Sequence, residues 1–464
     1  MIDPRIKEFG TLYTQDDVNY LIAPDNTAMV MGVNSAFSRL VIPKEVNCAI
    51  VTAIDASAFE NDLNLMSVEL PDTIKEIGAM AFYYCENLDE IILPDGLETI
   101  GFMAFTGCDS LEEVNLGSSL KEIGYEAFAN CGLTNIVLPE GLKQIGYRAF
   151  SGNDIVKVSI PDSIEEVGVA CFDSPDLELN EKNHVLYLGN EHNPYLVAYT
   201  LPNYYCMQTV IDDDCKVICD GMFSSINSEY SFESPTLFCN GVVSIKIGRG
   251  VKFIPLQAFE YLPRLIEIFN LSTVDCSPES EYFAETEFKP VAYFTSEDAE
   301  SIIIDDEEYD ISYYEHNGKK ILAYSTGDKA VVNVPPYIDE IAPYAFECDE
   351  MVEINIPDSV KKIGIYAFLF CPNLSKINVG NGVKEVGYNA FYSCEELEYL
   401  DSEPLYAKFD EDGDFILDED IQVKYLGNAE NKHVIGVIHT AEELTSDWII
   451  TQREPNVLAF NEPM

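Results

Sequence analysis

The chain has 464 residues, of which 47% are apolar and 11% aromatic, so it can bury an extended core and should not be disordered. A single core stops growing at about 250–300 residues, so this length indicates either several domains or one repeat array. The sequence carries 81 acidic side chains against 27 basic ones, a formal net charge of −54. This balance argues against nucleic acid and anionic membranes as partners, because both attract clustered lysine and arginine.

Residues 1–8 lack the basic and apolar stretches of a secretory signal peptide. No apolar run approaches the roughly 18 residues of a membrane span, so we expect no membrane insertion. Residues 1–36 have hairpin character over 18–27, and we interpret them as an N-terminal cap.

A repeat of 22 to 23 residues follows, shown well by 65–87, 88–110 and 111–132. Its most regular feature is one phenylalanine per unit, preceded by alanine in nine of eleven units. These signature phenylalanines are Phe59, Phe82, Phe105, Phe128, Phe150, Phe172, Phe223, Phe259, Phe346, Phe368 and Phe391. Such a period predicts a solenoid, in which stacked units bury a continuous core that one unit cannot form.

Each unit opens with a first element, Leu-x-x-Ile-x-Ile, whose alternating apolar residues predict a short parallel β-strand. Pro94-Asp95-Gly96 shows the turn that ends it. A second short element, Leu-x-x-Ile-Gly, follows, and Gly101 permits a backbone approach that a side chain would obstruct. The fold class is therefore a mainly β repeat solenoid with short second elements and β-hairpin insertions.

The chain divides at sequence level into seven segments. We predict the cap (1–36), a first array (37–177), a hairpin insertion (178–207), degenerate repeats (208–271), an acidic irregular insertion (272–329), a second array (330–400) and a C-terminal hairpin and cap region (401–464). The hairpins are predicted from similar Gly-Asn-containing stretches at 186–199 and 423–438.

Five of the 13 cysteines lie three residues after a signature phenylalanine, namely Cys85, Cys108, Cys131, Cys371 and Cys394. We interpret this position as a structural column, because free cysteine packs as a small buried apolar residue. The alternative, a row of metal ligands, lacks C-x-x-C pairs and nearby histidine.

The pattern Leu-x-x-Ile-x-Ile-Pro-x-x-Leu-x-x-Ile-Gly-x-x-Ala-Phe-x-x-Cys resembles the BspA-like leucine-rich repeat family over about 275 residues. The resemblance implies a leucine-rich-repeat fold, adhesion to matrix proteins or to other cells, and a cell-surface or secreted location. The missing signal peptide and anchor also leave a cytoplasmic or virion-associated location open.

No motif supports catalysis, and we predict no catalytic residue, metal site or cofactor. The five histidines lie outside ligand spacings, and no serine has a G-x-S-x-G context. We interpret Asp410–Asp414 as a hairpin turn in preference to a calcium-binding loop, because its glycine is at the wrong position for an EF-hand. Asp212–Asp214 and Asp305–Glu308 are interpreted as solvated runs, with weak cation binding as the alternative.

The residue between the two inward positions of each first element should point outward, and we call this position the outward column. The candidate partner-binding residues taken from it are Glu69, Asn115, Phe269, Asn333, Asn355, Asn378 and Asp401. The three asparagines predict either a ladder bonded to itself or a row of groups for a partner. Asp89, Glu90, Glu112 and Glu113 make the first array's face attractive to a basic partner.

These observations favour a non-enzymatic module that binds a protein partner, either a basic protein or a host or cell-surface protein. One alternative is a structural component of an envelope or virion. Another is an acidic decoy for a basic protein.

Overall fold

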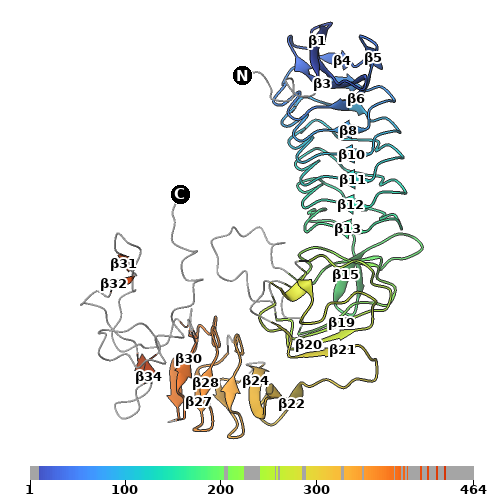
Figure 1. The fold of residues 1–464 in the computed structure, drawn as a ribbon. Coiled ribbons are helices and arrows are strands. Elements are labelled where there is room, and N and C mark those ends of the chain that lie inside the picture. The colour runs from blue at the N-terminus through green and yellow to red at the C-terminus, as the bar shows by residue number, and fades with distance from the viewer. Residues whose placement is uncertain are drawn as a thin grey trace. The chain divides into compact units, whose positions relative to one another are not determined.

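The computed structural model describes residues 10–202, 207–223, 241–256, 258–259, 262–284, 289–325, 329–346, 350–380, 382–387, 390–391 and 394, and the backbone of four short strands between 408 and 434. The chain forms two compact units, Met1–Ala299 and Glu300–Met464. Each unit is described by itself (Figure 1).

Unit 1 begins with three antiparallel strands, β1 (Thr11–Gln15), β2 (Val18–Ile22) and β3 (Thr27–Val33). The β1–β2 turn consists of Asp16 and Asp17, with φ of 50° and 61°. We call such a three-stranded unit a meander. Its last strand, β3, pairs in parallel with β6 (Ala49–Ile54), so the meander leads directly into the repeats.

Two parallel ladders run along the first array. The second elements form the longer one, as β6 is followed by β8 (Glu76–Ile77), β10 (Thr99–Ile100), β11 (Glu122–Ile123), β12 (Gln144–Ile145) and β13 (Glu166–Val167). The first elements form β4 (Arg39–Val41), β7 (Ser67–Glu69) and β9 (Glu90–Ile92). A further short strand, β5 (Glu45–Val46), pairs antiparallel with β6.

We expected a strand in every first element, and this is wrong for the later units of the first array. After β9 only the single bridge between Ile92 and Asn115 continues the first ladder.

The signature phenylalanines form the centre of the core. Phe59 to Phe172 stack in one row, with ring centroids of successive members 5.0 to 5.4 Å apart. All of them are buried. Successive rings therefore shield one another from water, and parallel offset stacking adds to the apolar burial.

The expected role of Gly101 is confirmed. A Cβ at this position would lie 2.8 Å from the backbone N of Ala79 in the preceding coil. Gly124 and Gly146 meet the coil before them in the same way. The glycine thus allows adjacent coils to approach at the spacing that strand pairing requires.

A second meander follows the first array: β14 (Asn180–Lys182), β15 (Val185–Leu188) and β16 (Val197–Thr200). The strand β16 pairs in parallel with β18 (Val217–Ile218). A parallel sheet of first elements completes unit 1, in the order β17 (Gln208–Val210), β19 (Ser244–Ile247), β20 (Glu267–Asn270) and β21 (Ala292–Phe294).

The degenerate repeats contain one more unit than the sequence indicated. Phe283, in the 3-10 turn η3 (Glu281–Phe283), stacks on Phe259 with a centroid distance of 5.4 Å. Phe259 in turn stacks on Phe223. Phe283 is preceded by tyrosine in place of the usual alanine, so the Ala-Phe signature did not reveal it.

Unit 2 begins with a third meander: β22 (Ile304–Asp306), β23 (Ile311–His316) and β24 (Lys319–Ser325). It leads into a ladder of second elements, β26 (Glu340–Ile341), β28 (Lys362–Ile363) and β30 (Glu385–Val386). The first elements pair as β25 (Val331–Asn333), β27 (Glu353–Ile356) and β29 (Lys376–Val379).

The stretch 272–329 is therefore not irregular, because it contains β21 and the whole third meander. Its acidic composition hid alternating apolar residues and the Asn317-Gly318 turn between β23 and β24. In the C-terminal region, β31 (Lys408–Phe409) pairs antiparallel with β32 (Phe415–Ile416), and β33 (Tyr425–Leu426) with β34 (His433–Val434). Asp410–Asp414 lies outside the described residues.

Candidate functional site

The outward column of the first array presents apolar side chains to solvent. Val41, Ile92 and Val137 keep 55%, 56% and 72% of their surface exposed. Glu69 and Asn115 lie between them in the column and are exposed as well. Because a residue facing the core from these strands is almost fully buried, the column is the side of the coil that a partner can reach.

Carboxylates next to this column have no counter-charge among the described residues. Asp89, Glu112 and Glu113 are exposed and make no ion pair there. Glu90 accepts a hydrogen bond of 3.2 Å from the hydroxyl of Ser67. The expected acidic character of this face is therefore present in the folded chain.

Two carboxylates beside the second ladder are, in contrast, paired with lysines of neighbouring coils. Glu98 pairs with Lys75 at 3.4 Å and with Lys121 at 2.6 Å, and Glu165 pairs with Lys143 at 2.9 Å. These pairs are largely exposed, so each contributes little to stability.

An exposed row of aromatic side chains was not anticipated from the sequence. In three successive coils, the residue directly after the glycine of the second element (Leu-x-x-Ile-Gly) is aromatic: Phe102, Tyr125 and Tyr147. Their ring centroids are 5.4 Å and 4.7 Å apart. Alignment of the repeats by this glycine would have revealed the row. Phe102 and Tyr125 are tilted against each other, whereas Tyr125 and Tyr147 stack.

In the degenerate repeats the outward column is less open. The ring of Phe269 stacks on Phe294 at 4.8 Å, and Phe269 is only partly exposed. The adjacent member of the column, Lys246, is also partly exposed. This part of the column is thus partly covered by its own neighbours.

The asparagines of the second array bond to one another, as the ladder alternative predicts. Asn355 donates from Nδ2 to Oδ1 of Asn333 at 2.9 Å, and Asn378 donates to Oδ1 of Asn355 at 2.6 Å. Asn378 also donates to Oε1 of Glu353 at 2.7 Å. The remaining amide groups of the row still face solvent. Asp401, the last predicted member, lies outside the described residues.

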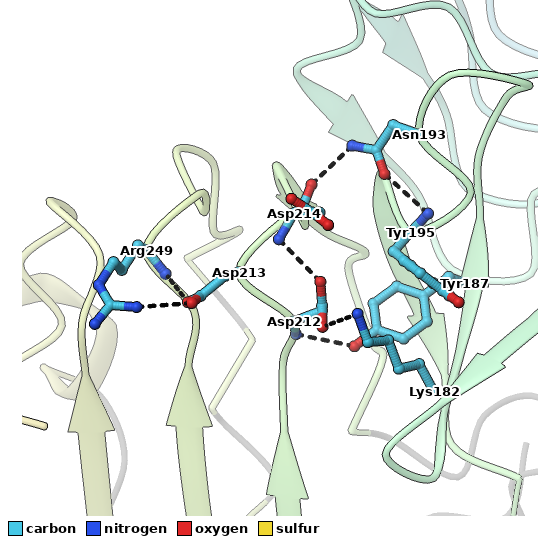
Figure 2. A network of polar contacts seen from close by, with 8 residues as sticks. All are labelled: Lys182, Tyr187, Asn193, Tyr195, Asp212, Asp213, Asp214 and Arg249. Atoms are coloured by element: carbon cyan, nitrogen blue, oxygen red, sulfur yellow. Dashed lines mark hydrogen bonds and ion pairs between the residues drawn. The ribbon is translucent and has the colours of Figure 1, made fainter.

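Within the run Asp212–Asp214, Asp212 is buried, which corrects the interpretation from sequence for that residue, whereas Asp213 and Asp214 are exposed as expected. Figure 2 shows the partners of the run. Lys182 approaches Oδ2 of Asp212 at 2.6 Å, and the backbone N–H of Asp212 donates to the hydroxyl oxygen of Tyr187 at 3.1 Å. Arg249 donates from Nη1 to Oδ2 of Asp213 at 2.7 Å.

The same network joins the second meander to the coils that follow it. Lys182 lies 4.4 Å above the ring of Tyr195, and Asn193 donates to the backbone carbonyl of Asp214 at 2.8 Å. Lysine and arginine thus occupy the places that a cation would take. We conclude that these aspartates hold the insertion in position, and that a role in cation binding is not needed to explain them.

The cysteine position forms the expected structural column. Cys85, Cys108 and Cys131 are buried, and each Sγ lies 3.0 to 3.2 Å from a phenylalanine carbonyl of an earlier coil. Asn153 takes the same position in the next coil and donates to the carbonyl of Phe128. Burial raises the pKa of Cys85 and of Cys131 to about 12. The thiols are therefore held as neutral donors.

Among the described residues, no group of three or more histidine, cysteine, aspartate or glutamate side chains is placed to hold a metal ion. In the same part of the chain, no helix is long and apolar enough to cross a membrane.

Parallel coils of 22 to 23 residues, with stacked phenylalanines and a buried Cys/Asn column, define a leucine-rich-repeat solenoid. Residues 52–178 and 324–411 match the family described as "BspA type Leucine rich repeat region", in six copies. This match to the family confirms the resemblance drawn from the sequence.

Solved bacterial structures are similar to the chain. A leucine-rich-repeat protein from Bacteroides ovatus is 22% identical, with 83% of this chain and 93% of that chain covered and a TM-score of 0.41. A leucine-rich cell surface protein from Faecalibacterium prausnitzii is 22% identical, with 84% and 82% covered and a TM-score of 0.34. The leucine-rich-repeat protein of T. pallidum is 25% identical, with 46% and 87% covered and a TM-score of 0.37.

No curated protein matches the chain.

Proposed function

We propose that the chain is a non-enzymatic protein-binding module that serves adhesion, with the outward column of its arrays as the binding surface. The observation that carries this proposal is the exposure of Val41, Ile92 and Val137 along the outward column. Exposed apolar side chains on a flat, repetitive surface are typical of interaction sites.

The polar members of the column would supply specificity. Glu69 and Asn115 alternate with the apolar side chains in the first array, and Phe269 offers a partly exposed ring in the degenerate repeats. In the second array, the ladder of Asn333, Asn355 and Asn378 presents a fixed row of amide groups, because each bond to a neighbour orients the next side chain. Asp401 would extend that row.

The partner is a protein whose contact surface combines apolar with basic side chains. Asp89, Glu112 and Glu113 beside the column favour positive charge in a partner and speed its approach at low salt. A host or cell-surface protein of this kind fits the proposed role in adhesion.

The test is affinity capture with the intact chain, followed by titration of the captured protein. The double variant Ile92→Ser/Val137→Ser should bind at least about tenfold more weakly, since buried apolar contacts are lost at the centre of the surface. The control is Leu63→Ser, because Leu63 is 52% exposed but lies outside the column. A second variant changes Asn333, Asn355 and Asn378 to alanine.

Equal binding by the double variant and the control would contradict the proposed surface. Capture of nothing except copies of the chain would contradict adhesion and support a structural or assembly component instead.

A further inference from the structure

The strand β1 lies at the end of a sheet of ten strands, and among the described residues only β2 pairs with it. The turn between them has two residues, both with positive φ, so Gln15 and Val18 form the hydrogen-bonded pair next to the turn. Hydrogen-bonded and non-hydrogen-bonded residue pairs then alternate along the antiparallel ladder. The N–H and C=O groups of Leu12 and Thr14 therefore point away from β2.

These outward groups have no partner among the described residues. Leu12 is 52% exposed, and β1 pairs with β2 in continuous register, without a bulge. The strand Thr-Leu-Tyr-Thr-Gln contains no charge and no proline. Charges, prolines and bulges are the usual features that prevent an edge strand from pairing with another chain.

The other two meanders provide an internal comparison. Their edge strands, β14 and β22, have three residues each against five in β1. The strand β14 carries Glu181 and Lys182, and β22 carries Asp305 and Asp306. Both interior edges are thus short and charged, whereas the equivalent edge at the start of the first array is longer and uncharged.

We propose that β1 pairs antiparallel with β1 of a second copy of this chain, about a two-fold axis at Tyr13. In that register Leu12 lies opposite Thr14 of the other copy, and each of the two equivalent pairs exchanges two backbone hydrogen bonds, about four in total. Thr11 lies opposite Gln15, so no charged residues of the two strands face each other. The two sheets of ten strands become one continuous sheet across the dimer.

The composition of β1 favours a second copy as the occupant of this edge, because the uncharged strand does not repel its own copy. Two copies with a net charge of −54 each repel one another over most of their surfaces. In the β1–β1 register, however, the two copies touch without placing carboxylates of these strands in contact. Added salt screens the remaining repulsion, so pairing should strengthen as the ionic strength rises.

The experiment measures the weight-average mass of the full chain by sedimentation equilibrium, from about 1 to 100 µM, at about 0.01 and 0.15 M salt. We expect the mass to rise toward twice the monomer value, and to do so at lower protein concentration in the higher salt. Thr14→Pro removes an outward N–H that no internal bond uses, and it should keep the chain monomeric. Thr14→Glu introduces the charge that β14 has at the equivalent position, Glu181, and should do the same.

The matched control is Glu181→Pro, the same change at the outward position of β14, which should leave dimer formation unaltered. A thermal melt of each variant verifies that it is folded. A monomeric full chain at the highest concentration, or a dimer that persists in both Thr14 variants, would overturn the proposal.

A further arm uses residues 10–464, which should dimerise like the full chain. If dimers form only after residues 1–9 are removed, the occupant of the edge is the chain's own N-terminal segment, and the proposal is wrong. This test is independent of the proposed adhesion, because Thr14 lies outside the outward column.

Discussion

Gly124 shows how strictly a single position can control the stacking of coils. A Cβ there would lie 2.7 Å from the carbonyl carbon of Gly101 and 2.8 Å from the backbone N of Phe102. Gly124→Ala should therefore force the two coils apart and lower the free energy of unfolding by about 3 kcal/mol. Urea denaturation measures this loss. Gly96→Ala, whose Cβ would meet only the Asp72 carbonyl oxygen at 3.1 Å, should cost less, and an equal cost would contradict the argument.

The buried thiols give a second prediction at the residue scale. Burial raises the pKa of Cys85 and Cys131 to about 12, so neither is ionised near neutral pH, and Cys108 is buried between them. The exposed Cys48 should react rapidly with a maleimide, whereas the column should react only after unfolding. The number of rapidly reacting thiols is measured in a variant with Cys206, Cys239 and Cys348 changed to serine. A second fast thiol in the native variant would contradict this expectation.

The protonation state of the Asp220 carboxyl should affect the stability of the fold. Burial raises its pKa, and it in turn contributes to the raised pKa of Glu166, after burial of that residue. A carboxyl with a higher pKa in the folded state favours folding when protonated. Stability should thus fall as the pH rises from about 3.9 through the folded pKa.

Asp220→Asn should accordingly raise the melting temperature at pH 7 and leave it unchanged below about pH 3.5, where the carboxyl is protonated in both states. Glu165→Gln is the matched control, because Glu165 is paired with Lys143 and its loss should not stabilise the fold at pH 7. Equal stabilisation by both variants would show that overall charge, and not the burial of Asp220, is responsible.

At the scale of elements, the asparagine ladder spans three strands, β25, β27 and β29. Asn355 takes part in two of its hydrogen bonds and Asn333 in one. Asn355→Ala should therefore lower the free energy of unfolding by about 1–2 kcal/mol and Asn333→Ala by about half as much, since one exposed bond contributes about 0.5–1.5 kcal/mol. Chemical denaturation of the two variants makes the comparison. No loss in either would mean that the side chains are available to a partner without a structural role.

The elements also show what the sequence could and could not predict. The strand, the turn and the Ala-Phe pair all lie within one coil and recur in each coil. Local periodicity was therefore sufficient to place the core and the outward column. Asp212 pairs with Lys182, 30 residues earlier, and Asp213 pairs with Arg249, 36 residues later, so no local pattern connects them. The third meander was missed for another reason: its acidic composition outweighed the Asn317-Gly318 turn, which is a strong hairpin signal.

At the scale of the whole molecule, each unit has its own core and begins with its own meander. The core of unit 2 extends from Ile311 to Cys394 and includes Leu322 of β24, which is fully buried. A solenoid needs its terminal core covered, and the third meander provides this cover for the second array. Residues 300–464 expressed alone should therefore fold, with a β-rich circular dichroism spectrum and a cooperative thermal transition.

The decisive comparison is with residues 330–464, which lack the third meander. This fragment exposes the ladder edge of β26 that β24 covers, and it should be unfolded or aggregate. If 300–464 were unfolded alone, the second array would depend on unit 1, and its meander would not be a sufficient cap. If 330–464 folded as well as the longer fragment, the meander would have another role, and its recurrence before each ladder of second elements would require a different explanation.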